Sequence, residues 1–180
     1  MTTRFLNDRD LGGAITKLMR GCDLRCAVAF WGIGATDRLF PSGVPEDARI
    51  VCELSIGSTN PEVLRAMGAP ENKRLKHLEQ LHAKVYISDQ GAIVCSANAS
   101  DNGIGFVEVA GLVEAGVLIE PGTKAFLQVE GWFGKFGTAA AMWTRRRLGG
   151  RRRCGAADLA RETGRRICRS LPMRLHCWAR

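Results

Sequence analysis

The sequence predicts an α/β domain, in which strands and helices alternate along the chain and pack in layers. Short apolar runs typical of buried strands alternate with segments that have the apolar spacing of helices. The composition, 46% hydrophobic and 24% charged, is that of a globular protein. With 180 residues, the chain is long enough for one domain with a core, or for one domain and a tail.

Each element is predicted from its local pattern. The predicted helices are 10–20 with Asp10 as cap, 60–67 with Asn60 as cap and Pro61 in the first turn, and a last helix from about Lys124. The predicted strands are 27–31, 49–56, 81–87, 92–98 and 112–119. The charged stretch 71–79 is predicted to be a solvated helix face or a loop.

Positive charge is concentrated in one part of the chain. Residues 145–180 contain twelve arginines, no lysine and two acids, a net charge of +10, so residues 1–144 carry a net charge of −2. We therefore predict a folded domain over residues 1–144 and an Arg-rich tail over residues 145–180. Such a tail can hold phosphates nonspecifically, but its arginine runs equally resemble a GC-rich gene translated out of frame. Both interpretations stay open, as does whether the tail is ordered.

Several classes of protein are excluded by pattern. No uninterrupted apolar stretch approaches the ~18 residues of a membrane span, and the first residues lack the apolar segment of a signal peptide. The seven cysteines contain no Cys-x-x-Cys pair, and Gly32-x-Gly34 lacks the third glycine of a dinucleotide loop. We expect a cytoplasmic protein that needs no metal and no other cofactor.

The most informative segment is a predicted hairpin. A three-residue loop, 89–91, would place Ser88 opposite Ala92, and Gly91 suits the positive φ that such loops favour at their third position. Since side chains alternate between the two faces of a strand, this register puts four polar groups on one face and an apolar core on the other. The four are His82, Lys84, Ser96 and Asn98.

These four side chains suit chemistry at an anionic centre. Lys84 and Asn98 can bind nonbridging oxygens and stabilise the charge that develops in a transition state. His82, neutral near pH 7, can act as a nucleophile or as a general acid–base.

The same residues resemble a known signature. His82-x-Lys84-x4-Asp89, followed by Ser96-x-Asn98, is similar to the HKD motif of the phospholipase D superfamily, His-x-Lys-x4-Asp-x6-Gly-Ser-x-Asn, with Cys95 at the position of the glycine. The resemblance extends over residues 10–135. It implies a mixed β-sheet flanked by helices, with the HKD hairpin at its centre.

The resemblance also implies an activity and a set of roles. The activity is metal-independent phosphodiester hydrolysis through a phosphohistidine. His82 would attack phosphorus, Lys84, Ser96 and Asn98 would hold the phosphoryl oxygens, and Asp89 would be a structural or orienting residue. Glu114 is preferred as the downstream acid of the family, and Glu108 stays open as its alternative.

A single motif supplies only one of the two histidines that this mechanism uses. We therefore predict a two-fold homodimer with a shared active site, acting on DNA or RNA in preference to phospholipid. Two alternatives stay open: a phospholipase D that acts on phospholipids, and a non-catalytic or truncated nucleic-acid-binding module. Whether the chain works within a larger restriction or defence system also stays open.

Overall fold

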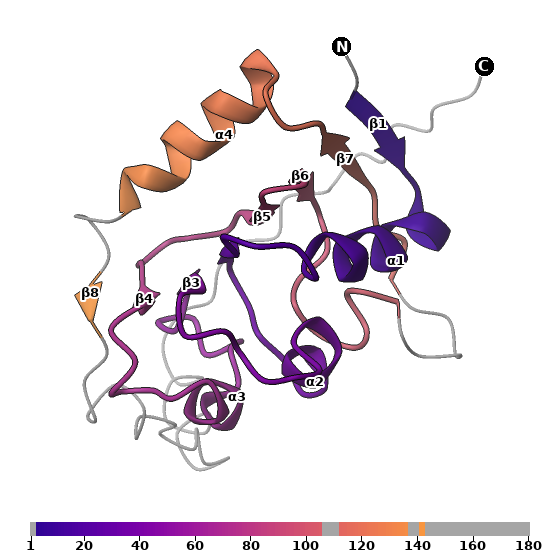
Figure 1. Cartoon of the computed structure of the whole chain (residues 1–180). Coiled ribbons are helices and arrows are strands. Elements are labelled where there is room, and N and C mark those ends of the chain that lie inside the picture. The colour runs from indigo at the N-terminus through magenta and orange to yellow at the C-terminus, as the bar shows by residue number, and fades with distance from the viewer. Residues whose placement is uncertain (1–2, 106–111, 137–140, 143–180) are drawn as a thin grey trace, which may run out of the picture. The chain divides into compact units, whose positions relative to one another are not determined.

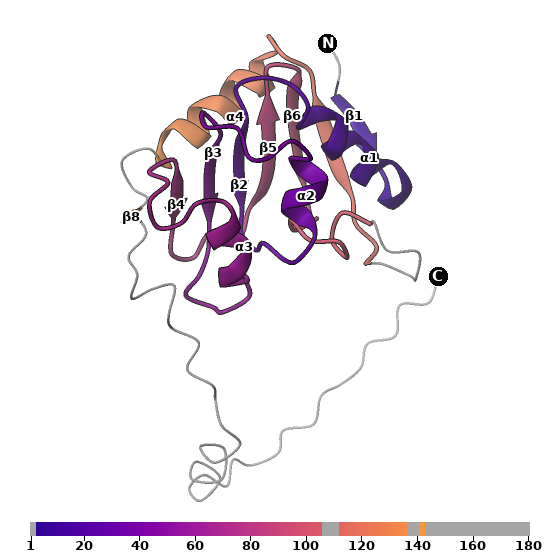
Figure 2. The same ribbon diagram turned by 60° about the horizontal axis from the view of Figure 1, so that its bottom comes forward.

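The protein is an α/β domain built on one mixed sheet, as the sequence predicts. A computed structural model describes residues 3–105 and 112–136, together with the backbone of residues 141–142. Within these residues, eight strands form a sheet in the order β1-β7-β6-β5-β2-β3-β4-β8. The β5–β6 hairpin, which carries the HKD-like residues, lies in the interior of this sheet (Figures 1 and 2).

The elements have the following bounds. The strands are β1 (Thr3–Leu6), β2 (Arg25–Val28), β3 (Arg49–Cys52), β4 (Leu75–His77), β5 (Lys84–Ser88), β6 (Gly91–Cys95), β7 (Gly116–Ile119) and β8 (Ala141–Met142). The helices are α1 (Asp8–Leu18), α2 (Ala35–Leu39), α3 (Pro61–Ala66) and α4 (Lys124–Gly134).

The strand directions bring several chain segments to one end of the sheet. Strands β2, β3 and β4 are parallel, whereas β5 is antiparallel to β2, β6 to β5, and β7 to β6. As a result, one end of the sheet holds the last residues of β2, β3, β4 and β6 and the first residues of β5 and β7. We call this the carboxyl end of the sheet, after its three parallel strands.

Helices cover both faces of the sheet (Figure 1). Helices α1, α2 and α3 pack on one face, where Leu11, Leu39 and Leu64 share a core with Tyr86 and other buried residues. Helix α4 packs on the opposite face over a smaller core, which contains Phe126, Phe133, Val85 and Ile87. The sheet is therefore buried on both sides, and the carboxyl end is where polar side chains can gather.

Helix α1 begins earlier than its apolar pattern predicts. Asn7, rather than Asp10, is the N-cap, and its side chain accepts hydrogen bonds from the backbone N–H groups of Arg9 and Asp10. The cap of α3 is Asn60, as predicted, with Pro61 at the first helical position. Asn7 and Asp10 are both polar residues that can cap a helix. The backbone geometry therefore decides which of them stands at the start of α1.

Glycine at position 12 allows α1 to approach the segment that follows β6. We expect Gly12→Ala to lower the free energy of unfolding by about 1–3 kcal/mol, because a Cβ there would lie 2.0 Å from the carbonyl oxygen of Ile104. Gly13→Ala, which meets nothing within 4 Å, should stabilise the same helix by about 0.5–1 kcal/mol. Urea unfolding of the two variants checks this contrast, and equal stabilities would contradict it.

Three strands and one helix lie where the sequence pattern indicates none. The stretch 71–79, predicted to be a solvated helix face or a loop, contains strand β4. Its residues Leu75 and His77 are buried, whereas Lys76 between them is half-buried. A strand of three residues is too short for a periodic signal, and the short elements β1, β8 and α2 were missed for the same reason.

One prediction concerns the limit of the domain. Residues 145–180 lie outside the described residues, so the division at residue 144 stays a prediction.

Within the part of the chain that the structure describes, no helix has the length and apolar character needed to span a membrane.

The hairpin register differs from the prediction by one residue. Ser88 pairs with Gly91, so the turn consists of the two residues Asp89 and Gln90 rather than of three. Lys84 consequently lies on the face of Tyr86 and Ile93, the face that packs against α1. Both faces of the hairpin are core, and the prediction of one polar and one apolar face is wrong.

The physical reason lies in strand β7. A Cβ at Gly91 would stand 2.6 Å from the carbonyl oxygen of Ile119, so glycine is needed there for the close approach of β7. The φ of Gly91, +139°, belongs to a residue already within the strand. The backbone N–H of Gln90 donates to the Ser88 hydroxyl at 3.1 Å, which closes the shorter turn.

Candidate active site

The site is built around His82 and Lys84 at the carboxyl end of the sheet. His82 is exposed just before β5, and Lys84, the first residue of β5, is buried. The Lys84 ammonium donates to the His82 carbonyl oxygen at 2.9 Å and lies 3.2 Å from His82 Nε2. With Lys84 protonated, Nε2 is the acceptor, so the proton of the neutral ring belongs on Nδ1.

Phe30 supports both residues and was not singled out by the sequence pattern. Its ring meets the His82 ring edge-on with centroids 6.0 Å apart, and the Lys84 ammonium lies 5.8 Å from its centroid. Phe30 follows β2, so the neighbouring strand determines where the imidazole stands. Phe30 is half-buried beside the motif.

Ser96 and Glu114 form the second part of the site. The Ser96 hydroxyl donates to the Glu114 carboxylate and accepts from the backbone N–H of Ala115 at 3.1 Å. The chain bends at Ser96 immediately after β6, and its backbone N–H donates to the Ala115 carbonyl oxygen at 3.0 Å. This bend ends the regular alternation of the strand at Ser96, whose contacts are with Glu114 and Ala115. Glu108 lies outside the described residues.

The carboxylate of Glu114 also acts on Lys84. Burial lowers the pKa of the Lys84 ammonium, and the charge of Glu114 opposes part of that shift, with the net pKa below its usual value of 10.5. The described contacts thus join His82 to Lys84 and Ser96 to Glu114, and the charge of Glu114 acts on Lys84.

Cys95 is the last residue of β6, and Asn98 follows it by three residues. The Oδ1 atom of Asn98 is buried and accepts no hydrogen bond from the described residues. The next residue, Ala99, donates its backbone N–H to the Phe30 carbonyl oxygen at 3.1 Å. The Cys95 thiol lies 3.7 Å from the Lys84 carbonyl oxygen, and burial raises its pKa to about 12.

Asp89 is at the opposite end of β5 from Lys84. Its carboxylate accepts from the backbone N–H of Cys22 at 2.7 Å, and its own N–H donates to the Cys22 carbonyl oxygen at 2.9 Å. These two bonds tie the hairpin turn to the loop after α1. The geometry gives Asp89 no contact with a substrate at His82.

A buried acid–histidine pair lies at the same end of the sheet. Glu53 follows β3, and its Oε1 atom lies 3.9 Å from Nδ1 of His77, the last residue of β4. Burial raises the pKa of Glu53, but the Ser55 hydroxyl at 2.6 Å, the Ser55 N–H and His77 outweigh it, so the pKa is lowered. Sequence spacing gave no signal for this pair, because its members come from different strands.

The pKa of Lys84 predicts a pH dependence. Since only the ammonium form binds an anion, activity should fall as pH rises through a midpoint below 10.5. Glu114→Gln removes an interaction that raises this pKa, so the alkaline midpoint should move to lower pH. Lys84→Arg, which stays protonated throughout, should remove the alkaline decline. Rates measured between pH 7 and 11 check both variants, and an alkaline midpoint that Lys84→Arg leaves in place would assign the decline to another group.

Comparisons with known proteins place the fold. No family model matches the sequence, and no curated protein matches it. The structure is similar to NucT from Helicobacter pylori, with 11% identity and a TM-score of 0.56 over 79% of this chain and 99% of that one. It is also similar to Nuc from Salmonella typhimurium, a phospholipase D family member, with 16% identity and a TM-score of 0.54 over 79% of this chain and 97% of that one.

A third solved structure is that of TrmBL2, an archaeal chromatin protein with its own mode of DNA binding. The identity is 9% and the TM-score 0.54, over 79% of this chain and 55% of that one. The fold of this chain is therefore similar to that of Nuc, a phospholipase D family member. The family resemblance that the HKD-like motif indicates is confirmed at the level of the fold.

Proposed function

We propose that this chain is a metal-independent phosphodiesterase, nuclease-like rather than lipid-directed, that works through a phosphohistidine at His82. The observation that carries the proposal is the juxtaposition of the Lys84 ammonium and His82 Nε2, 3.2 Å apart, within a phospholipase D fold. A neutral imidazole beside a fixed cation is suited to attack on a negatively charged phosphodiester.

The proposed reaction has two steps. In the first, the Nε2 lone pair of His82 attacks phosphorus, the bond to the leaving alkoxide breaks, and an acid donates a proton to that oxygen. In the second, water attacks the phosphohistidine, the N–P bond breaks, and the water proton returns to the same group acting as base. His82 ends as it began, so the net reaction consumes one water molecule.

Three other residues would bind the phosphoryl oxygens. Lys84 turns its ammonium from His82 Nε2 to a phosphoryl oxygen, which frees the Nε2 lone pair for the attack, and the Asn98 amide donates to another oxygen. Ser96, whose proton is held by Glu114 in the substrate-free chain, turns to donate when substrate binds. Glu114 keeps Lys84 charged and positions Ser96, while Asp89 acts at a distance by holding the turn.

The acid for the first step comes from a second copy of the chain. His77 is buried against Glu53, which makes it a poor proton donor to an exposed substrate. We therefore propose a two-fold dimer in which the partner's motif histidine protonates the leaving group. Exposed aliphatic side chains surround the carboxyl end of the sheet: Ile33, Ile56, Leu112 and Val113. Apolar groups gathered at one end are typical of an interface.

The test is hydrolysis of a generic phosphodiester by the full chain in excess EDTA. Purified protein should hydrolyse bis(p-nitrophenyl) phosphate, and EDTA should leave the rate unchanged. Single-stranded DNA, RNA and phosphatidylcholine vesicles are then compared as substrates. Cleavage of the nucleic acids with intact lipid supports the nuclease-like proposal, whereas choline release in their place would replace it with a phospholipase D.

A non-catalytic nucleic-acid-binding module is the second candidate. It is favoured by the +10 charge of residues 145–180 and by the likeness to the DNA-binding protein TrmBL2. Its signature is salt-sensitive DNA binding that survives His82→Ala and disappears when residues 145–180 are removed. A dimer that binds DNA in this way and hydrolyses no phosphodiester would identify it.

A further inference from the structure

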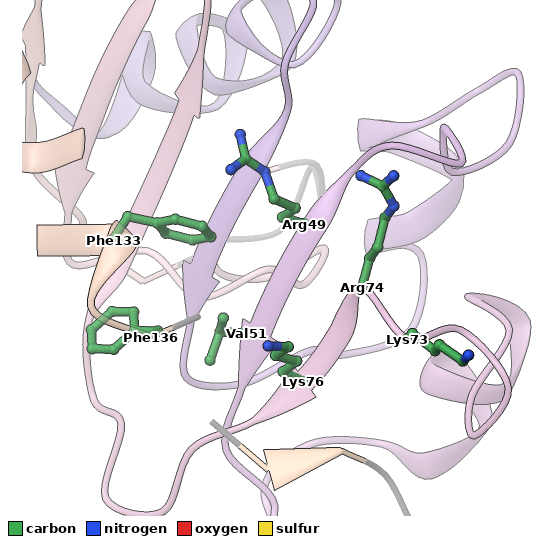
Figure 3. Close-up of a pocket in the computed structure, with 7 residues that line it drawn as sticks. All are labelled: Arg49, Val51, Lys73, Arg74, Lys76, Phe133 and Phe136. Carbon is green, nitrogen blue, oxygen red and sulfur yellow. The ribbon is translucent and has the colours of Figure 1, made fainter. Parts of the chain in front are cut away.

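A second site lies on the face of the sheet that α4 covers. It is a cavity of about 250 Å³ between strands β3 and β4 and the end of α4 (Figure 3). The active site is at the carboxyl end of the sheet, whereas this cavity reaches back to Arg49, the first residue of β3. The two sites are therefore distinct, and the cavity has no part in the proposed hydrolysis.

Strand register concentrates positive charge on this face. Val51 pairs with Lys76, so alternation places Arg49 and Val51 of β3, and Arg74 and Lys76 at β4, on the same side of the sheet. Lys73 also lines the cavity, and none of the described lining residues is acidic. Like charges on neighbouring strands repel each other, and a bound anion removes that repulsion.

One side of the cavity is aromatic (Figure 3). Phe133 and Val51 are buried, while Phe136 is half-buried and presents its ring beside the cations. The Phe136 ring is held from two directions, by Trp132 at a centroid distance of 4.6 Å and by Phe133 at 6.2 Å, both edge-on. A ring fixed in this way is a rigid platform for stacking. In Figure 3 the two phenyl rings lie to one side of the cationic side chains.

We propose that this cavity binds a nucleotide unit, with the base against Phe136 and the phosphate on Arg74, Lys76 and Arg49. Aromatic platforms interleaved with cations are how proteins bind single strands without sequence preference. The volume is slightly below the roughly 300 Å³ at which small-molecule sites begin, so it suits one planar ring system. A membrane surface fits less well, because Phe133 and Val51 are buried and Phe136 is only half-exposed.

Arg49 adds one constraint on the geometry. Its guanidinium is already paired with the carboxylate of Asp23, which also pairs with Arg25. Arg49 therefore contributes less to the phosphate than Arg74, whose Nη1 donates only to the carbonyl oxygen of Asp47, at 3.3 Å, within the described contacts. Arg74 is accordingly the residue on which the test is built.

The test compares two ligands of equal charge on the full chain carrying His82→Ala. Fluorescence anisotropy measures binding of a short labelled oligothymidylate and of the abasic oligomer of the same length. Because any contact of the Arg-rich tail with phosphates is the same for both, the difference between them reports stacking. We expect the oligothymidylate to bind about tenfold more tightly.

Three substitutions assign that difference to the cavity. Phe136→Leu keeps the apolar volume and should erase the preference for bases. Arg74→Glu should weaken both ligands about tenfold and reduce the slope of log affinity against log salt by about 0.7–1. Arg9→Glu, the same change on exposed α1, is the matched control and should alter neither. Circular dichroism confirms that each variant is folded.

The outcomes separate this proposal from the proposed activity. No preference for bases, or a preference that survives Phe136→Leu, overturns the nucleotide site. Binding of anionic vesicles that depends on Arg74, without base preference, overturns it in favour of a lipid headgroup. If thymidine monophosphate displaces the labelled oligothymidylate, the site binds a free nucleotide. If it does not displace the oligomer, the site binds a nucleotide within a strand. Phe136→Leu and Arg74→Glu are also made in the chain that keeps His82, and their hydrolysis of bis(p-nitrophenyl) phosphate tests the active site alone. If no hydrolysis is seen, the proposed activity is contradicted and the binding result still holds.

Discussion

His82→Ala should abolish phosphodiester hydrolysis while leaving the protein folded. We expect the EDTA-resistant rate on bis(p-nitrophenyl) phosphate to fall by about 10³-fold or more, because the variant has no nucleophile to form the covalent intermediate. His82 is exposed, and its side-chain contacts within the described residues are with Phe30 and Lys84. Its removal should therefore leave the unfolding midpoint within a few degrees of wild type.

The matched control is His176→Ala, which removes a histidine that stands outside the motif and outside the described residues. It should retain the wild-type rate. Acid-quenched reactions analysed by mass spectrometry add a second readout, since wild type should carry one phosphoryl adduct on the peptide containing His82. Full activity of His82→Ala would overturn the proposed mechanism, and an adduct on another residue would relocate the nucleophile.

Val113→Asp should convert a dimer into a monomer and remove activity with it. Val113 is 90% exposed next to Glu114, at the carboxyl end where the partner's histidine must enter. A carboxylate placed in an apolar interface loses its hydration without gaining a partner, so the dimer dissociation constant should rise at least about tenfold. Sedimentation equilibrium should then report one chain mass of 19.6 kDa in place of twice that value.

The dependence of specific activity on protein concentration distinguishes local damage to the site from loss of the dimer. If dissociation is the cause, raising the concentration of Val113→Asp should restore its specific activity in step with its dimer fraction. Leu127→Asp is the matched control, because Leu127 is 61% exposed and lies on the outer side of α4. This variant should remain dimeric and active. A wild-type chain that is monomeric and active at all concentrations would overturn the shared site.

The chemistry of the site was largely predictable from local sequence. His82 and Lys84 lie two residues apart on one extended segment, so their proximity follows from the backbone alone. Ser96 and Asn98 follow at the end of the next strand, and the hairpin brings that strand back. Glu114 was preferred over Glu108 on its sequence context, and the structure joins it to Ser96.

The details that position these groups were not predictable. Gly91 suggested a three-residue loop, whereas its smallness serves the contact with Ile119 of β7, a strand distant in sequence. The shifted register puts Ser96 and Lys84 out of step, and the link between them runs through Glu114, which accepts from Ser96 and whose charge acts on Lys84. Neither event leaves a local pattern, because each depends on a third strand.

What the sequence by itself determined is the type of domain, the start of α3, and the reactive residues with their spacing, because these depend on neighbours in the chain. The tertiary structure decided the hairpin register, the place of Phe30 beside His82, and the pairing of Glu53 with His77. It also decided the basic and aromatic cavity. Those features join the β5–β6 hairpin to β2 and β7, and strands β3 and β4 to each other and to helix α4. Their contacts arise only when the sheet has formed and each face has been covered.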